Sequence, residues 1–420
     1  MPERPAIFSV HWICDRIIKS GEEENHVDAL ATHRETYYGT LFEIIARASR
    51  LSSQANMKYT HIIMDCGAAI KMYHVLWNNP QLYSKIVVHL GDFHFMQAFF
   101  DVIGRFVTCS GFEDIVYQLG LCQPGSMNAM IKGKHYNQAW MIHELFAEAI
   151  VRIFLEEYLP SPPNSLCQVD RENIQSVLQA PEIEEYLQQY ELLAMKGSQG
   201  EYGKTAQFWL RYVEFVDLQQ RIHKSIQTNK FDERLLAWES MLPLFFFFDK
   251  THYSRYGSFY VHELKNMDAK YPGAKEELAA IGISIRRNDF GIGQAIDLAG
   301  EQTFIRGAKT AGGIKGFQTR RCTVLKWVRN RAQQTKFVEG LKEIAGVEKT
   351  TQNFRKCLRP SEIMKSDKIV ESIVKAMREH FTHPFDKSFE SGKLYNIVSG
   401  KPVADDICQS LSAVKDKEAS

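Results

Sequence analysis

The chain has 420 residues, with 51 lysines and arginines against 50 aspartates and glutamates, so its net charge is +1. That balance excludes a general electrostatic attraction to nucleic acid, and any basic surface must be local. A hydrophobic fraction of 45% and an aromatic fraction of 12% are typical of a globular core and exclude a disordered chain.

Cysteines and apolar runs indicate the compartment. The eight cysteines are scattered and form no CxxC pair, which excludes a zinc ribbon and fits a reducing environment. No stretch approaches the roughly 20 apolar residues that span a membrane, and the N-terminus lacks the apolar core of a signal peptide. We therefore expect an intracellular protein of the nucleus or cytoplasm, not secreted and without a membrane partner.

Residues 1–58 are expected to form an N-terminal helical and extended segment. Apolar residues recur at helical spacing over Tyr37–Leu51, which predicts an amphipathic helix. Asp15 ends an apolar run, and a helix-start or surface role is the simpler interpretation of it than a strand-end acid.

Residues 59–104 alternate between strand-like and helix-like runs. The pattern predicts a strand over Thr60–Met64, a helix over Ala68–Trp77, a strand over Lys85–Leu90, a turn over Gly91–His94 and a helix over Phe95–Val102. Such alternation predicts a parallel βαβ unit. Ligands bind at the carboxyl ends of parallel strands, and Asp65, Asp92 and His94 lie there in the sequence.

The remainder of the chain is expected to be mostly helical. Residues 105–240 show no strand-like alternation and predict an all-helical insertion. Residues 241–345 hold an aromatic segment and C-terminal helices that complete the core, and residues 346–420 form a charged tail. The predicted fold class is an α/β core with an incomplete sheet, flanking helices and a large helical insertion, mostly helical overall.

Two segments are candidates for nucleic-acid contact. Pro243–Tyr260 interleaves aromatic and basic residues, which suits base stacking; the alternative is a core helix. Gln294–Arg306 predicts a helix, and the glycine-rich loop Ala308–Gly316 and the basic helix Arg320–Lys342 follow it. The loop lacks P-loop spacing. The basic side chains proposed to contact a phosphate backbone are Arg306, Lys309, Lys315, Arg320 and Arg321.

An acidic constellation is the first candidate site. It combines Asp65, either Asp92 or Asp297, and Glu301, which lies four residues after Asp297 and so on the same helix face. Carboxylates of this kind hold the pair of Mg²⁺ or Mn²⁺ ions of two-metal phosphoryl transfer. The alternative is that Asp65 caps the following helix and Glu301 is exposed.

Other constellations carry less chemical information. His89, Asp92 and His94 are a candidate metal site, with structural hydrogen bonding as the alternative. His143-Glu144 is not part of HExxH, and no GxSxG is present. Nothing around Cys66 argues for a lowered thiol pKa.

Three motifs resemble a family of eukaryotic, transposon-derived proteins of unknown function. They are HIIMDCGAAIK, then VVHLGDFHFMQAFFDVIGR with GSMNAMIKGKHYNQAWMIHEL, and EQTFIRGAKTAGGIKGF after FFFFDKTHYSRYGSFY. Their layout resembles the RNase H-like core of DDE transposases, interrupted by a helical insertion. The resemblance implies that Asp65 is the second catalytic acid and Glu301 the third, and that the LGDFH segment lies where related transposases carry a Cys/His pair. The candidate metal ligands are then Asp65, Glu301, Asp92 and His94.

The expected first acid is absent from the pattern. Before Asp65 only Asp15 and Asp28 are aspartates, and neither lies in a strand-like run. The N-terminus is also short for the three-strand meander of a complete RNase H-like fold. These departures imply a fragment, a mispredicted gene product or a domesticated remnant.

Three functions follow from these patterns. The first is a transposase-derived nuclease or strand-transfer enzyme that uses Mg²⁺ or Mn²⁺ on DNA, in a chain that is degraded or domesticated. The second is a non-catalytic scaffold that binds DNA or protein. The third is a His/Asp metalloenzyme at HLGDFH. A homo-oligomer is a further expectation.

Overall fold

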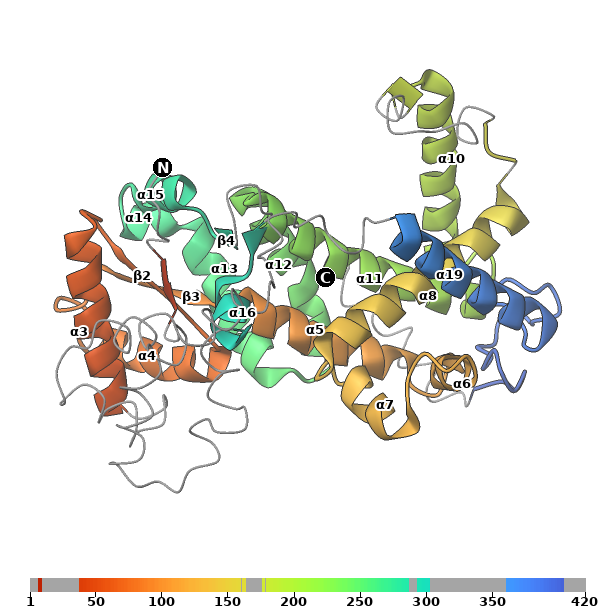
Figure 1. The fold of residues 1–420 in the computed structure, drawn as a ribbon, viewed down its shortest axis with the longest axis horizontal. Helices are drawn as coiled ribbons and strands as arrows, with labels where there is room; N and C mark the ends of the chain where they lie inside the picture. Colours follow the sequence, from red (N-terminus) through yellow and green to blue (C-terminus); the bar gives the residue numbers. More distant parts are fainter. Residues whose placement is uncertain are drawn as a thin grey trace, which may run out of the picture. The chain divides into compact units, whose positions relative to one another are not determined.

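The computed structural model describes residues 7–9, 38–159, 161–163, 176–177, 179–286, 293–302 and 360–403. The chain divides into two compact units, residues 1–96 with 221–353 and residues 97–220 with 354–420. In the described ranges the fold is mostly helical, with small sheets (Figure 1). No helix within those ranges is long and apolar enough to cross a membrane.

A three-stranded parallel sheet organises the first unit. Its order is β1 (Ile7–Ser9), β2 (Thr60–Met64) and β3 (Ile86–Leu90). In this register Ile63 of β2 lies between Ser9 and His89. Every residue of β2 and β3 is buried, as expected for apolar parallel strands covered on both faces. The predicted strands and their parallel pairing are confirmed.

Helix α3 (Tyr38–Gln54) precedes β2 in the chain, and further helices follow β2 and β3. Helix α3 packs against β2, and α4 (Cys66–Asn78) packs against β3 and α3 (Figure 1). Both agree with the predicted helices to within a few residues. Because each strand leads directly into a helix, the polar residues that follow β2 and β3 meet at one edge of the sheet.

Helix α5 (Asp92–Val107) begins earlier than the sequence predicts. The predicted turn over Gly91–His94 is wrong from Asp92 onward, since these residues form the first helical turn. The reason is long-range: the Asp297 carboxylate accepts hydrogen bonds from the backbone N–H groups of Phe93 and His94. Such a partner satisfies donors that every helix N-terminus leaves open.

The remaining elements of the first unit come from the second half of the chain. They are α12 (Phe231–Phe247), the π-helical turn η2 (Tyr253–Gly257), α13 (Ser258–Lys265), α14 (Met267–Lys270), α15 (Ala274–Ile281), the antiparallel pair β4 (Ile285–Arg286) and β5 (Gly293–Gln294), and α16 (Ile296–Gly300). Helices α12 and α13 pack on each other and on η2.

The aromatic segment Pro243–Tyr260 mainly supplies core. Phe245 and Tyr260 are buried, and the ring of Phe95 stacks on Trp238 and contacts Phe245. Phe246 is an exception, with 58% of its surface exposed. The core interpretation therefore accounts for most of this segment.

The regular elements of the second unit are helices in its described residues, apart from an isolated antiparallel bridge between Tyr395 and Pro402. Its elements are α6 (Phe112–Gln118), α7 (Pro124–Ile131), α8 (Tyr136–Tyr158), α10 (Pro181–Ser198), α11 (Lys204–Thr228, up to Gln220), and α19 (Pro360–Glu379). Helix α19 packs along α8. Residues of α5 after Met96 also belong to this unit, whereas α12 belongs to the first.

His143 illustrates how the second unit uses a polar side chain as core. Its ring is buried and stacks between Phe100 and Phe112, and its Nδ1 atom lies 3.1 Å from the Tyr212 hydroxyl. Burial lowers the pKa of His143 to about 3. The imidazole is therefore a neutral core side chain and acts as neither a metal ligand nor a catalytic base.

We expect Gly104→Ala to destabilise the protein strongly. An added Cβ would lie 2.2 Å from the carbonyl oxygen of Ile131, so α5 or the end of α7 must move. The expected cost is about 2 kcal/mol or more. Thermal unfolding of the full chain measures it. Gly125→Ala is the matched control, because nothing lies within 4 Å of its added Cβ. Equal melting temperatures for the two variants would contradict this packing.

Candidate functional site

His94 is the point at which the candidate site residues meet. It lies in the first turn of α5, directly after β3, and its side chain is 25% exposed. Its Nδ1 atom is 3.0 Å from Asp297 Oδ2, and its Nε2 atom is 3.9 Å from Glu301 Oε1. One ring nitrogen is thus held by the buried Asp297, while the other ring nitrogen is directed toward Glu301.

Asp297 holds both the helix and the ring in place. Its side chain is buried, and its two oxygens accept from the backbone N–H groups of Phe93 and His94 at 3.1 Å each. Gly91 makes room for it, because a Cβ there would lie 2.3 Å from Asp297 Oδ2. The sequence named Asp297 only as an alternative to Asp92 in the acidic constellation; its role depends on a contact across some 200 residues.

The pKa values of this pair are shifted toward the charged forms. Burial opposes ionisation of Asp297, but the hydrogen bonds from His94 and the backbone outweigh it and lower its pKa. Burial also opposes the imidazolium of His94, but the hydrogen bond to Asp297 and the carboxylates of Asp297, Asp65 and Glu301 together raise its pKa. The result is a charged His94–Asp297 pair.

Asp65 takes part in two interactions. It follows β2 and caps α4, since its Oδ1 atom accepts from the backbone N–H of Ala68 at 2.9 Å. The capping alternative from the sequence is therefore confirmed. Its charge also lies close enough to raise the pKa of His94. Glu301 thus lies beside the imidazole, while the charge of Asp65 acts on the same ring and one Asp65 oxygen caps α4.

Asp92 points away from this cluster into the core. Both of its oxygens accept from Arg234 Nε, at 2.8 and 2.9 Å, and Oδ1 accepts from Trp238 Nε1 at 2.9 Å. Burial raises the pKa of Asp92 and the neighbouring Arg234 only partly offsets this. The carboxylate ties β3 and α5 to α12, so in this arrangement its oxygens are not available as metal ligands.

His89 also faces the core. Its Nε2 atom lies 2.9 Å from His61 Nδ1, and its Nδ1 atom lies 3.2 Å from the Tyr260 hydroxyl. Burial, together with His61 and Arg234, lowers the pKa of His89 far below its ordinary value. The three side chains of the HLGDFH metal hypothesis therefore point to different partners, and only His94 faces the acidic cluster.

A protein metal site needs several donor side chains close to one point. Among the described residues, no group of three or more histidine, cysteine, aspartate or glutamate side chains could hold a metal ion. The proposed set of Asp65, Asp92, His94 and Glu301 is thus only partly assembled: Asp65 and Glu301 act on the His94 ring, and Asp92 is engaged elsewhere.

The remaining site predictions concern Cys66 and the basic residues proposed for DNA contact. Cys66 is buried, and burial with the nearby Asp65 raises the pKa of its thiol to about 12, which leaves no thiolate for nucleophilic chemistry. The basic residues proposed for DNA, namely Arg306, Lys309, Lys315, Arg320 and Arg321, lie outside the described residues. Their role stays a prediction, as does the homo-oligomer.

We expect Asp92→Asn to destabilise the protein by about 3–5 kcal/mol, because it leaves the buried guanidinium of Arg234 without its counter-charge. Denaturant or thermal unfolding measures the loss. The control is Glu239→Gln, which removes the exposed partner of Lys265 and should have little effect. Similar losses in both variants would show that Asp92–Arg234 is no buried anchor.

The His94–Asp297 pair gives a defined pH dependence. With a pKa raised above 6.5, His94 contributes stability that is complete at lower pH and lost as pH rises through its folded-state pKa. With a pKa lowered below 3.8, Asp297 contributes stability that is lost as pH falls through its folded-state pKa. Between about pH 4 and 6.5 both contributions are present.

We therefore expect His94→Gln to cost most stability, about 1.5–3 kcal/mol, in that window and less at higher pH. Unfolding of the wild type and the variant across pH measures the difference. An NMR titration should place the His94 pKa above 6.5 in the wild type and lower in Asp297→Asn. A stability difference that is constant with pH would contradict the charged pair.

Comparison with known proteins gives one match. A family model described as Domain of unknown function (DUF8702) matches residues 26–418, a range that includes Asp65, His94, Asp297 and Glu301. No curated protein and no solved structure matches the chain. The transposase and RNase H-like resemblance therefore stays a prediction. Since the match extends over most of its length, the chain belongs to the DUF8702 family.

Proposed function

We propose that this protein is a transposase-derived, RNase H-like enzyme that cuts or joins DNA phosphodiesters with a divalent cation at Asp65, His94 and Glu301. The observation that supports it most is that the two ring nitrogens of His94 face Asp297 and Glu301, with the charge of Asp65 also acting on this ring. Asp65 and Glu301 lie before and after the predicted helical insertion in the sequence, as the transposase layout requires.

The sheet supports the same proposal. Strands β1, β2 and β3 are parallel, so their carboxyl ends share one edge. Asp65 follows β2, His94 follows β3, and Glu301 follows α16. A strand-end acid, a neighbouring strand with its helix and a later helix-borne acid are thus present. The residues of β1 itself, Ile7–Ser9, include no acid.

The donor chemistry fits Mg²⁺ or Mn²⁺. Carboxylate oxygens suit both ions, and an imidazole suits Mn²⁺ better. Asp297 accepts the Nδ1–H hydrogen bond of His94, so in the neutral ring the Nε2 lone pair faces outward in the manner of a supported histidine ligand. Ligands of one such ion lie about 3 Å apart, so Glu301, at 3.9 Å from Nε2, must approach by about 1 Å.

Electrostatics favour a cation at this place. The carboxylates of Asp65, Asp297 and Glu301 all act on a single imidazole, so the cluster is negative whether or not His94 is protonated. Such a cluster repels a phosphodiester unless a cation compensates it. A bound divalent ion would neutralise phosphoryl oxygens and activate the attacking hydroxyl or water. Asp297 would keep the His94 ring oriented throughout.

A non-catalytic scaffold is the second candidate. It is favoured by the absence, among described residues, of three preassembled ligands, and by the capping role of Asp65. The two candidates differ in whether the acids around His94 bind a divalent ion at all. The metalloenzyme hypothesis at HLGDFH merges with the first candidate, since His94 alone of that motif's histidines faces the cluster.

We expect the wild type to bind Mn²⁺, and Asp65→Asn, His94→Asn and Glu301→Gln each to bind it about tenfold or more weakly. Calorimetric titration measures the affinity, and nicking of a supercoiled plasmid with Mn²⁺ measures the activity. Asn at position 65 retains a side-chain oxygen for capping α4, so that variant isolates the lost charge.

Glu276→Gln is the matched control, because Glu276 is an exposed acid in the first turn of α15. It should bind Mn²⁺ and nick DNA as the wild type does. A wild type that binds no Mn²⁺, or the same affinity in all four variants, would refute the cation site and leave the scaffold.

A further inference from the structure

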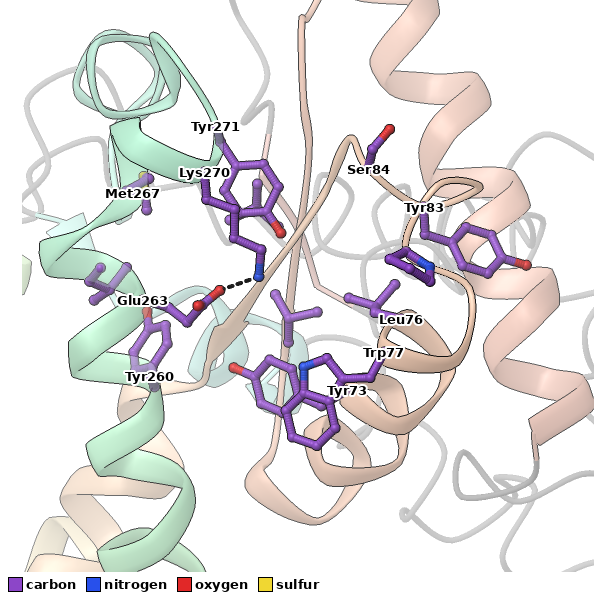
Figure 2. A pocket seen from close by; sticks show the side chains of 14 residues that line it. Tyr73, Leu76, Trp77, Tyr83, Ser84, Tyr260, Glu263, Met267, Lys270 and Tyr271 are labelled. Atoms are coloured by element: carbon purple, nitrogen blue, oxygen red, sulfur yellow. Dashed lines mark hydrogen bonds and ion pairs between the residues drawn. The ribbon is translucent and has the colours of Figure 1, made fainter.

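A cavity separate from the cluster around His94 lies beside the sheet, between α4 and the α13–α14 segment (Figure 2). Its volume is about 350 Å³, within the range of about 300–1,000 Å³ that small-molecule sites occupy. Val87 and Val88 of β3 contribute to its lining. We name it the α4–α13 cavity. None of Asp65, His94, Asp297 and Glu301 lines it.

Aromatic rings form its walls. Tyr73 and Trp77, one turn apart on α4, stack with centroids 5.6 Å apart and planes 14° from parallel. Tyr260 and Tyr271 lie on the opposite side (Figure 2). Trp77 is 48% exposed, so its ring stands at the rim where a ligand can reach it. Flat, partly open aromatic walls favour a flat ligand that stacks.

Two polar features lie among these rings. Lys270 donates to Glu263 at 2.5 Å across one wall, which places a charged donor and a charged acceptor side by side (Figure 2). The Tyr73 hydroxyl is buried and has no hydrogen-bond partner in the structure. Figure 2 shows this hydroxyl directed toward the α13 side of the cavity. A buried hydroxyl without a partner is unfavourable and uncommon.

We infer that the α4–α13 cavity binds a planar heteroaromatic ring with donors and acceptors along its edge, namely a nucleobase. The exposed ring of Trp77, backed by Tyr73, provides the stacking surface, and the Tyr73 hydroxyl with the Glu263–Lys270 pair provides partners for the ring edge. Every nucleobase combines a π-face with such an edge. The inference does not depend on the cation site.

The charge of the lining argues for a neutral ring over an organic cation. Aromatic walls beside a carboxylate also suit an alkylammonium group. Here, however, Lys270 already pairs with Glu263 and its ammonium lies 5.2 Å from the centre of the Tyr271 ring. A cationic ligand would have to displace the chain's own ammonium, whereas a neutral ring leaves the pair intact.

The test is calorimetric titration of the full chain with adenosine and, separately, with a single-stranded DNA hexamer, both in EDTA so that the cation site plays no part. We expect binding that Trp77→Leu weakens about tenfold, because a stacking ring is lost. Tyr73→Phe removes only the hydroxyl and should weaken binding about tenfold while leaving the melting temperature of the free protein unchanged or higher.

Phe246→Leu is the matched control, since it removes an exposed ring of the same unit that does not line the cavity. Adenosine binding with the expected losses identifies a free nucleoside or nucleotide as the source. Hexamer binding alone, with the same losses, identifies a base of a nucleic-acid strand. Both outcomes support the cavity as a nucleobase site.

Three results would overturn the inference. The first is no binding of either probe at millimolar concentration. The second is binding that Trp77→Leu and Tyr73→Phe leave unchanged. The third is tighter binding of tetramethylammonium than of adenosine with the same sensitivity to Trp77→Leu, which would make the cavity a cation cage.

Discussion

The carboxylate of Asp297 accepts three hydrogen bonds at the beginning of α5, two from backbone N–H groups and one from the His94 ring. This single side chain decides where α5 begins, which way the imidazole faces and which of its nitrogens remains outward. Gly91 is part of the same constraint, because any side chain there would occupy the space of the carboxylate. Without this contact, the His94 ring would not be held in the position where the acids at the sheet edge act on it.

A buried network of polar side chains lies next to the site. Asp92 accepts hydrogen bonds from Arg234 and Trp238, and Arg234 also donates to Tyr260. From Tyr260 the network continues through His89 and His61 to Glu277, whose carboxylate lies 3.7 Å from His61 Nε2. It links β2 and β3 to helices from the later half of the sequence. Such networks are worth more for fixing one arrangement than for net stability, since desolvation offsets much of their attraction. They make the first unit a rigid support for its edge residues.

Helix α4 takes part in both candidate sites. Its first turn is capped by Asp65, whose charge reaches His94, and its later turns present Tyr73 and Trp77 to the α4–α13 cavity. The two places differ in character: one is a carboxylate cluster with a single imidazole, and the other is an aromatic cavity with an internally neutralised ion pair. Chemistry on phosphoesters and recognition of a base would be complementary tasks for one unit of the chain.

The sequence by itself determined the elements that depend on local pattern. Thr60–Met64 and Ile86–Leu90 are mostly apolar, and in the structure they are buried parallel strands, while Asp65 follows the first of them as a strand-end acid. Only the tertiary structure decided the start of α5, the separation of Asp92 from His94 and the central role of Asp297. It also brought Tyr73 and Tyr260 to one cavity. The physical reason is that apolar periodicity acts over a few residues, whereas the partners of these polar groups lie from about 140 to 200 residues away, and no local pattern specifies which of several acids meets which donor.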